Sequence, residues 1–328
     1  MSERSVEDWI GAQYGDYTIQ ELVGEGTFSM VFRAVDRFGG QERALKIPRP
    51  YISAREKPDE FIPTQVFIQR ADRYSLQEAS PVHIQKIQVA RTKAVNDRGL
   101  VSVDRYSFER DKAFTRMPLL SGKTYRQYMR AGPVPIKLLR NIAGTLERLS
   151  NNEEFGYHGD VKPENMIVTT DGVILVDCGY FGSIEMDEDE IYEQKALIVT
   201  TPRYYPHLKP DDLLAFGLIL WETALRKPLL SSVAYSRDFD LDDVAEELVE
   251  SVHQEESLGN FNFSQILDAA PPSEFRPGIP ARVEDFLLKA VRLKFRDDNI
   301  LDVVEGFESF EELDVELGNL IRSGIHYL

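Results

Sequence analysis

The sequence predicts an α+β protein of two lobes, a small β-rich lobe followed by a larger helical lobe. In the first third of the chain, short β-branched and aromatic runs are separated by glycines, which is typical of antiparallel strands joined by tight turns. After about residue 205, apolar residues recur at helical spacing, which is typical of amphipathic helices. The 328 residues, 42 % of them hydrophobic, suffice for a core in each lobe.

The first lobe is predicted to begin with a hairpin and a third strand, over residues 17–23, 30–35 and 44–47. A helix is then predicted over residues 64–79. Further strands are predicted over residues 84–95 and 113–118. These elements would form a small antiparallel sheet accompanied by one helix.

The second lobe is predicted to be mainly helical. Pro135 stands at the tolerated first turn of a helix whose apolar residues, from Leu138 to Leu149, recur at three- and four-residue spacing. Later helices are predicted over residues 211–225, 240–256, 280–293 and 309–321. These helices would supply the core of the larger lobe.

Charge is unevenly distributed along the chain. The formal net charge is −17, and residues 238–328 hold 22 acidic and 7 basic residues, a net −15. An acidic protein repels phosphate backbones, so nucleic acid is not expected as a partner. The acidic quarter is interpreted as a solvated surface, or else as a platform for basic segments of a protein partner, whose binding would weaken as salt rises.

Cysteine content and hydropathy narrow the class of protein. The single cysteine, Cys178, excludes an internal disulfide framework and a cysteine-built zinc site, and we expect a buried small hydrophobe rather than a redox switch. Residues 1–8 lack the apolar run of a signal peptide. The longest apolar stretch, Leu213–Trp221, is far shorter than the ~20 residues of a membrane span. The sequence therefore predicts a cytoplasmic protein with no membrane span.

A glycine-rich turn and a lysine in an apolar strand predict a phosphate site in the first lobe. Gly24 and Gly26 lie between two predicted strands, where the backbone amides of a glycine turn can approach a phosphate. Lys46 lies 20 residues beyond Gly26, and its ammonium group is costly to bury unless it meets an anion. Taken alone, the glycines are compatible with an ordinary hairpin, and Lys46 is compatible with an edge-strand lysine whose ammonium group reaches water. Taken together, they favour a phosphate site.

The segment His158–Asn165 carries the most specific pattern. Asp160, Lys162 and Asn165 place a carboxylate, a cation and a neutral metal ligand on one loop before an apolar strand. Asp177 follows a second apolar strand, where its carboxylate can hold a metal ion. Magnesium prefers such oxygen ligands together with phosphate oxygens. Phosphoryl transfer needs this combination of positioning, metal neutralisation and a carboxylate that orients the acceptor hydroxyl.

With these motifs the sequence resembles the eukaryotic-type, or Hanks-type, serine/threonine protein kinases, over roughly residues 17–320. Six motifs follow the family's order. They are the glycine-rich loop, Ala44-Leu45-Lys46, the loop around Asp160, Asp177-Cys178-Gly179, Thr201-Pro202-Arg203-Tyr204-Tyr205 and Asp212-Leu213-Leu214-Ala215-Phe216-Gly217. The resemblance implies a bilobal kinase fold that uses ATP and Mg²⁺ on a protein substrate. Its implied parts are an N-terminal extension, the N-lobe, the C-lobe and a C-terminal tail, at residues 1–16, 17–118, 119–323 and 324–328.

The resemblance also implies a role for each matching residue. Lys46 would hold the α- and β-phosphates, Asp160 would be the base that orients the acceptor, and Lys162 would steady the γ-phosphoryl group. Asn165 and Asp177 would bind Mg²⁺. The other ATP contacts would come from Val23, Gly24, Glu25, Gly26, Thr27, Phe28, Ser29, Val31, Ala44, Met117 at the gatekeeper position, Leu119 in the hinge, and Ile167.

Three departures from the family pattern concern regulation. Gly159 stands where an arginine usually precedes the catalytic aspartate, so this non-RD chain is expected to be active without phosphorylation of the 177–201 segment. Cys178 replaces the family's phenylalanine. The glutamate that should pair with Lys46 is not evident, because an insertion follows that strand. Its candidate substitutes are Glu60, Glu78, Gln69 and Asp72.

Two other functions stay open at this point. A pseudokinase or nucleotide-binding scaffold would account for the missing glutamate, although such proteins typically have lost a phosphate- or metal-binding residue, and all are present here. A small-molecule kinase similar to the aminoglycoside phosphotransferases would share His-Gly-Asp and an asparagine five residues later. Lys162, Thr201-Pro202 and the helix beginning near Asp212 favour a protein kinase over that alternative.

Overall fold

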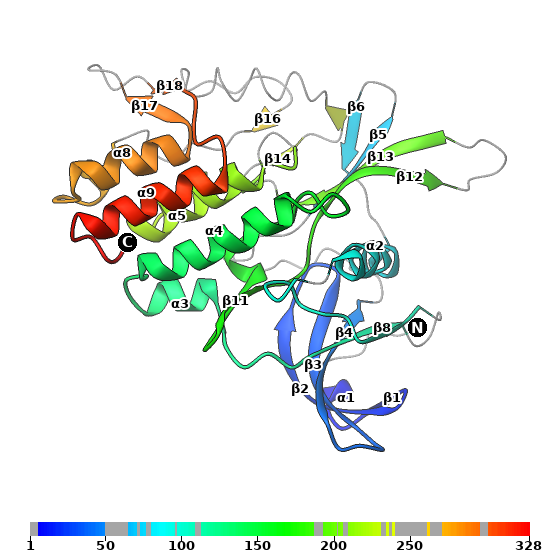
Figure 1. The fold of residues 1–328 in the computed structure, drawn as a ribbon. Coiled ribbons are helices and arrows are strands. Elements are labelled where there is room, and N and C mark those ends of the chain that lie inside the picture. The colour runs from blue at the N-terminus through cyan, green and yellow to red at the C-terminus, as the bar shows by residue number, and fades with distance from the viewer. Residues whose placement is uncertain are drawn as a thin grey trace.

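A computed structural model shows a bilobal α+β architecture, with a β-sheet lobe near the N-terminus and a larger helical lobe (Figure 1). The structure describes residues 6–49, 65–70, 73–76, 80–95, 97–108, 113–186, 193–201, 203–205, 209–230, 234–235, 238–239, 261–262, 271–295 and 301–328. The predicted fold class is confirmed.

The small lobe is a six-stranded antiparallel sheet with strand order β1-β2-β3-β4-β8-β7. Its strands are β1 (Gln13–Tyr14), β2 (Tyr17–Glu25), β3 (Ser29–Asp36), β4 (Glu42–Pro48), β7 (Arg105–Ser107) and β8 (Phe114–Met117). Ile19, Phe32 and Leu45 are fully buried on one face of this sheet, as the alternation of side chains along strands requires. Trp9, at the end of α1 (Val6–Trp9), stacks on Phe32 with ring centroids 5.8 Å apart and closes this core.

Between β4 and β7, strands occur where a helix was predicted, and a helix occurs where a strand was predicted. The helix predicted over residues 64–79 is wrong, because β5 (Gln65–Arg70) and β6 (Arg73–Leu76) form a hairpin there. The strand predicted over residues 84–95 is also wrong, because α2 (Pro81–Ala94) covers that stretch. The helix predicted for this lobe therefore lies later in the sequence than expected.

The residues buried on α2 explain the wrong assignment. They are Ile84, Gln85, Val89 and Thr92. Two of these four are polar, so an apolar helical period is not visible in the sequence, whereas the β-branched isoleucine and valine favour a strand. Gln85 and Thr92 are tolerated inside because Gln85 Nε2 donates to Lys46 O and Thr92 Oγ1 donates to Gln88 O.

The large lobe is built on helices that pack in pairs, α4 against α9 and α5 against α8 (Figure 1). Its helices are α3 (Tyr125–Ala131), α4 (Ile136–Ser150), η1 (Pro163–Asn165), α5 (Asp212–Leu225), α7 (Pro272–Phe275), α8 (Ala281–Ala290) and α9 (Phe310–Arg322). The helices predicted after Pro135 and over residues 211–225, 280–293 and 309–321 are confirmed, with small shifts at their ends. The helix predicted over residues 240–256 lies outside the described residues.

Three short sheets belong to the large lobe. One contains β9 (Lys123–Thr124), β10 (Met166–Thr169) and β11 (Gly172–Leu175). The others pair β14 (Ala234–Tyr235) with β16 (Phe261–Asn262), and β17 (Leu293–Phe295) with β18 (Leu301–Val303). Because β10 starts directly after Asn165 and β11 ends just before Asp177, the β10–β11 hairpin sets the distance between these two predicted metal ligands.

The segment after Asp177 forms a hairpin that the sequence did not indicate, made of β12 (Tyr180–Met186) and β13 (Glu193–Thr200). β13 also pairs with β5, giving a five-stranded sheet in the order β12-β13-β5-β6-β15, with β15 (Asp238–Phe239) at one edge. Figure 1 shows this sheet beside α2. Residues 65–70 and 73–76 are therefore strands because they pair with distant parts of the chain.

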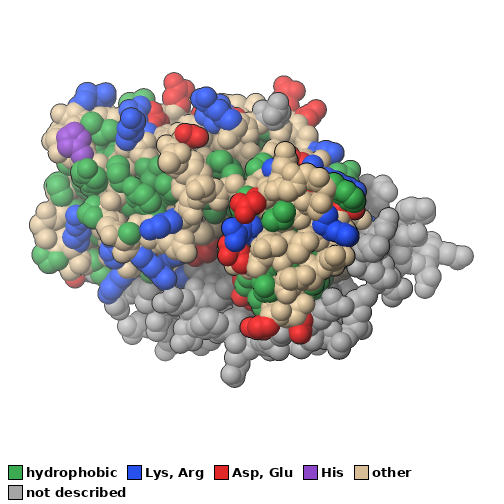
Figure 2. All heavy atoms as spheres, turned by 90° about the horizontal axis from the view of Figure 1, so that it is seen from below, with side chains coloured by type: hydrophobic (Ala, Val, Ile, Leu, Met, Phe, Trp, Pro, Cys, Tyr) green, Lys and Arg blue, Asp and Glu red, His purple; other side chains and the backbone are tan. Residues whose placement is uncertain are grey.

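The described surface shows mixed charge. Figure 2, seen from the side of β2 and β3, shows Lys and Arg side chains interspersed with Asp and Glu over the described atoms. Among the described residues, no helix combines the length and apolarity that crossing a lipid bilayer requires.

Candidate active site

The loop at residues 158–165 is tied to α5 by a buried carboxylate. Asp212, the first residue of α5, accepts hydrogen bonds from the backbone N–H of His158 and, at 2.9 Å, from that of Gly159. Tyr205 Oη donates to the same carboxylate at 2.6 Å. The N-terminal end of a helix also favours a negative charge. These contacts fix the main chain immediately before Asp160.

The imidazole of His158 supports the same loop. Its Nε2 lies 3.1 Å from Val176 O, and its Nδ1 accepts from Asp160 N at 3.3 Å. The carbonyl can only accept, so Nε2 carries the proton of a neutral ring. Complete burial lowers the pKa of His158, because the charged form loses its solvation. The neutral ring thus joins the end of β11 to the catalytic loop.

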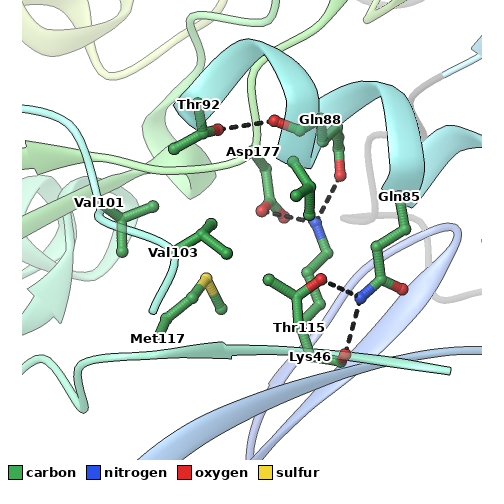
Figure 3. A pocket seen from close by; sticks show the side chains of 10 residues that line it. Lys46, Gln85, Gln88, Thr92, Val101, Val103, Thr115, Met117 and Asp177 are labelled. Atoms are coloured by element: carbon green, nitrogen blue, oxygen red, sulfur yellow. Dashed lines mark hydrogen bonds and ion pairs between the residues drawn. The ribbon is translucent and has the colours of Figure 1, made fainter. Parts of the chain in front are cut away.

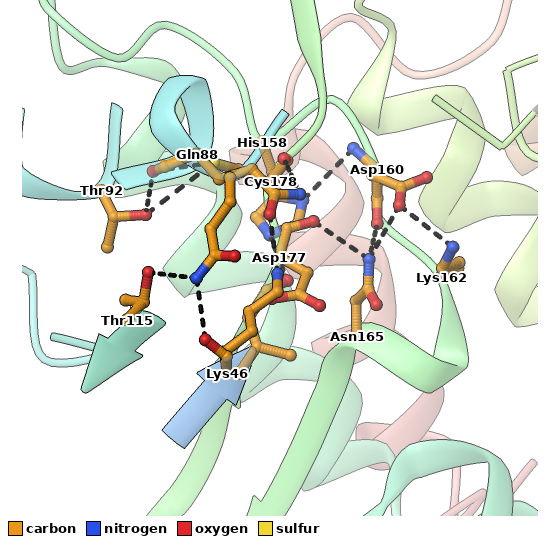
Figure 4. A network of polar contacts seen from close by, with 12 residues as sticks. Lys46, Gln88, Thr92, Thr115, His158, Asp160, Lys162, Asn165, Asp177 and Cys178 are labelled. Carbon is orange, nitrogen blue, oxygen red and sulfur yellow. Dashed lines mark hydrogen bonds and ion pairs between the residues drawn. The ribbon is translucent and has the colours of Figure 1, made fainter. Parts of the chain in front are cut away.

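The three predicted residues of the loop meet in one polar cluster (Figure 4). Asn165 Nδ2 donates to Asp160 Oδ2 and to Asp160 O, each at 2.9 Å, and to Asp177 O at 3.2 Å. Lys162 Nζ lies 3.1 Å from Asp160 Oδ2 and donates to Thr201 Oγ1 at 2.8 Å. Because the amide nitrogen of Asn165 faces these acceptors, its amide oxygen is the atom that suits a metal ion.

Lys46 is buried at the end of β4, with 5 % of its surface exposed. Its Nζ lies 2.6 Å from Asp177 Oδ1 and donates to Gln88 Oε1 at 2.7 Å. A buried ammonium group is tolerated only when it is paired. Lys46 and Asp177, predicted from distant motifs, therefore meet directly (Figure 4).

In the described part of the chain, the residue that accompanies Lys46 is Gln88 on α2, which was not among the sequence-based candidates. Glu60, Asp72 and Glu78 lie outside the described residues, and the structure describes only the main chain of Gln69, in β5. Gln88 was missed because its segment was predicted as a strand. Recognising Pro81 as a helix start would have placed it.

The donor set fits a magnesium ion shared with phosphate. Asp177 adopts φ of +56°, a left-handed conformation that aspartate tolerates. The Asp177 carboxylate and the Asn165 amide are hard oxygen ligands, and Mg²⁺ takes one or two such groups with phosphate oxygens and waters. Among the described residues no group of three or more His, Cys, Asp and Glu side chains forms an all-protein metal cage.

The glycine-rich loop between β2 and β3 is a tight turn. Gly26 N donates to Ser29 O at 2.8 Å. Arg49, which the sequence reasoning did not single out, pairs with Glu25 and donates through Nε to Gly26 O at 3.1 Å. Arg49, which directly follows β4, therefore stabilises the glycine-rich loop. Thr27 and Phe28 complete it.

Four of the predicted adenine-site residues come together and two do not. Ala44 and Met117 are buried in one small cluster, with Val31 and Leu119 packed against them. Val23 is 45 % exposed on β2, and Ile167 is half-buried on β10, outside this cluster. A small pocket continues from Met117 toward α2 (Figure 3). It is lined by Lys46, Gln85, Gln88, Val89, Thr92, Val101, Val103, Thr115, Met117 and Asp177.

Gly159 occupies a position that disfavours a side chain. It has φ of +81°, and a Cβ there would lie 3.0 Å from the Tyr157 ring and 3.3 Å from the Phe181 ring. Those two rings meet edge to face at 5.7 Å, and Phe181 N donates to Tyr157 Oη at 3.0 Å. Aromatic packing therefore fills the space next to Asp160 on the side of β12.

Arg91 on α2 links this region to the helix. Its guanidinium donates to the carbonyl oxygens of Phe155, Tyr157, His158 and Gly179. It also lies over two aromatic rings, with Cζ 4.6 Å from the centroid of Phe155 and 4.2 Å from that of Tyr157. The side chain of Arg91 thus connects α2 to the segment before Asp160 and to the segment after Asp177.

Cys178 is buried, with 1 % of its surface exposed. Burial raises the pKa of its thiol, which disfavours the reactive thiolate. The expectation of a small buried hydrophobe is confirmed.

A second buried network, not foreseen from the sequence, fixes the segment that follows Thr201. Arg126 on α3 pairs with Glu164, at 2.7 Å, and with Glu222 on α5. Tyr204 Oη accepts from Arg126 at 2.8 Å and donates to Glu222 at 2.9 Å. Tyr204, shortly after Thr201, is therefore hydrogen bonded to both α3 and α5.

Comparisons with known proteins agree on one family. The curated relatives include serine/threonine-protein kinase PknD of Mycobacterium tuberculosis, 24 % identical over 293 residues and 86 % of this chain. They also include serine/threonine-protein kinase PknL of Mycobacterium bovis, 30 % identical over 243 residues and 67 % of this chain. The chain spans 37 % of the length of PknD and 53 % of that of PknL. No protein-family model matches the chain.

Solved structures show the same fold. A crystal structure of a variant of the Mycobacterium tuberculosis PknI kinase domain has a TM-score of 0.52 and 15 % sequence identity. The match covers 95 % of this chain and 98 % of that domain. At this identity the likeness establishes the bilobal kinase fold.

Proposed function

Because the chain belongs to the Hanks-type serine/threonine protein kinase family, we propose that it transfers the γ-phosphoryl group of ATP to a serine or threonine hydroxyl of a protein. The single observation that carries this proposal is the cluster of Lys46, Asp160, Asn165 and Asp177. Asn165 bonds to both aspartates, and Asp177 pairs with Lys46. The proposed kinase domain has its lobes at 17–118 and 119–323.

In this proposal the side chains divide the work of phosphoryl transfer between positioning and charge stabilisation. Lys46 binds the α- and β-phosphates, and Asn165 and Asp177 hold Mg²⁺. When bound, the metal would neutralise charge on the β- and γ-phosphates. The glycine-rich loop contributes backbone N–H groups, and the Ala44 and Met117 cluster contacts the adenine.

Asp160 orients the acceptor hydroxyl and accepts its proton. Lys162 lies beside that carboxylate and bonds Thr201, so it can meet the γ-phosphoryl group while its position is held by the activation segment. This contact between Lys162 and Thr201 supports a protein kinase over a kinase similar to the aminoglycoside phosphotransferases. The intact polar cluster argues against a pseudokinase.

We further propose that the activity does not require phosphorylation of the 177–201 segment. Gly159 leaves no arginine to read a phosphate, and its φ and crowded surroundings disfavour one. Thr200 Oγ1 donates to Gly159 O at 2.8 Å, and both Thr200 and Thr201 are fully buried. Arg91 ties α2 to the loop through carbonyl oxygens that are always present.

The acidic last quarter supports a preference for substrates with basic segments. Residues 238–328 hold nearly all of the excess negative charge, and complementary charge speeds encounter and selects partners.

The proposal is tested by comparing wild type with Asp160→Asn in an autophosphorylation assay with mapping of the modified residues by mass spectrometry. Wild type should modify serine or threonine. Asp160→Asn should lose turnover while binding the nucleotide, because a contact made in the transition state is seen mainly in kcat. Equal turnover of the two proteins, or transfer to aminoglycosides alone, would overturn it.

A further inference from the structure

Gln88 uses both ends of its amide at the centre of the candidate site. Its Oε1 accepts from Lys46 Nζ at 2.7 Å, and its Nε2 donates to Cys178 O at 3.1 Å. The ammonium group can only donate and the carbonyl can only accept, so the amide has a single orientation that satisfies both partners. Figure 4 shows Gln88 reaching toward Lys46 and Cys178 from α2.

We infer that Gln88 is a positioning residue, whose neutral amide joins Lys46 to the turn that carries Asp177 and does so better than a carboxylate would. The inference rests on the proposed function of the same site. A glutamate could still accept from Lys46, but it has no N–H for Cys178 O. Two acceptors would then face each other, and a buried acceptor left unpaired is costly.

The turn next to Gln88 is tightly held, so the position of Cys178 O is defined. A Cβ on Gly179 would lie 2.3 Å from Gly159 O and 2.4 Å from Val199 O, which leaves the main chain little room to shift. Arg91, one turn after Gln88 on α2, donates to Gly179 O. Gln88 and Arg91 therefore donate to the carbonyl oxygens of two consecutive residues, Cys178 and Gly179, directly after Asp177.

The same face of α2 is also attached to β4, one turn earlier. Gln85 Nε2 donates to Lys46 O at 2.9 Å and to Thr115 Oγ1 at 2.6 Å. The side-chain amides of Gln85 and Gln88 thus donate to main-chain carbonyl oxygens, and Gln85 also donates to a hydroxyl group. The helix is positioned by hydrogen bonds to the backbone on either side of the Lys46–Asp177 pair.

A neutral partner also leaves the charge of Lys46 available. Among the described residues, Asp177 is the carboxylate that lies within ion-pair distance of Lys46. Gln88 therefore orients the ammonium group through a neutral acceptor, while its amide N–H remains available for Cys178 O.

Three variants separate the possible roles of this side chain. Gln88→Glu keeps an acceptor for Lys46 and removes the donor to Cys178. Gln88→Met keeps the length of the side chain without either polar contact. Gln127→Glu is the matched control, because Gln127 caps α3 by accepting from Thr124 N at 3.1 Å, a contact that glutamate makes equally well.

Each variant is measured for kcat, for KM of ATP, for the Mg²⁺ concentration giving half-maximal rate, and for melting temperature. The rise in melting temperature with the non-hydrolysable analogue adenylyl imidodiphosphate is measured with and without MgCl2. This binding readout stays informative if the wild type shows no phosphoryl transfer, so failure of the proposed function and failure of the inference are distinguishable.

We expect Gln88→Glu and Gln88→Met each to lower kcat/KM about tenfold or more, as loss of a buried hydrogen bond predicts. Both should need more Mg²⁺ and show a smaller magnesium-dependent melting shift, because the Asp177 turn loses an anchor. Gln127→Glu should match wild type. Wild-type behaviour of Gln88→Glu would show that the amide donor has no role, and wild-type behaviour of Gln88→Met would show that Gln88 only fills space. Either result would overturn the inference.

Discussion

Replacing Gly159 with alanine tests whether the position before Asp160 can carry any side chain. Its φ of +81° lies in the left-handed region, which costs an L-residue about 1–2 kcal/mol. The new Cβ would lie 3.0 Å from the Tyr157 ring and 3.3 Å from the Phe181 ring. Moving those rings adds about 1–2 kcal/mol, as in overpacked cores. The expected loss in the free energy of unfolding is therefore about 2–4 kcal/mol.

Gly156→Ala is the matched control for the backbone contribution. Gly156 lies in the same loop with φ of +68°, and a Cβ there meets nothing within 4 Å. Its alanine variant should lose only the backbone contribution, about 1–2 kcal/mol. At an unfolding entropy of about 2.1 cal/mol/K per residue, each kcal/mol lowers the melting temperature of a chain of this length by about 1.5 °C. Gly159→Ala should therefore melt at least about 1.5 °C below Gly156→Ala in calorimetry.

The kinase assay completes this test. Gly159→Ala should also lower kcat, because the Phe181 ring packs on Tyr205, whose Oη accepts from the backbone N–H of Val161 next to Asp160. Gly156→Ala should keep kcat. Equal melting temperatures for the two variants would refute the reasoning, since the ring contacts would then carry no cost. The pocket beside the catalytic loop would have to be regarded as able to accept the family's arginine.

Two further predictions concern Arg91 and His158. Arg91→Met should lower kcat about tenfold or more, because four carbonyl oxygens lose a charged donor. An unchanged rate in single-turnover kinetics would exclude Arg91 as the link between α2 and the loop that carries Asp160. The pKa of His158 is lowered by burial, so the unfolded chain binds a proton that the folded chain does not. The free energy of unfolding should therefore fall as pH drops below 6.5, the ordinary pKa of histidine. Urea unfolding between pH 7 and 5 should show a flatter dependence for His158→Gln than for wild type, and identical slopes would contradict the assignment.

The sequence was sufficient where chemistry is concentrated in short motifs. Asp160, Lys162 and Asn165 lie within six positions, and the hairpin of β10 and β11 leads directly to Asp177. Local sequence was also sufficient for α4, α8 and α9, because a helix that buries one apolar face against a core repeats that face in its sequence. α5 is instead buried on nearly all sides, and its sequence is a continuous apolar run from Leu213 to Trp221.

The sequence was insufficient where polar residues are buried or where strands pair at a distance. α2 buries Gln85 and Thr92, so its period was hidden, and with it the place of Gln88. β5 is a strand because it pairs with β13, a contact that no local propensity reports.

The sequence by itself determined the fold class, the family and the residues predicted to bind phosphate and metal, because those residues stand in ordered motifs of fixed spacing. Only the tertiary structure decided which side chain accompanies Lys46 and what fills the space beside Gly159. Both depend on the meeting of α2 with the turn after Asp177, where side chains far apart in sequence satisfy buried main-chain acceptors. Such acceptors carry no sequence signature, since every residue has a carbonyl group.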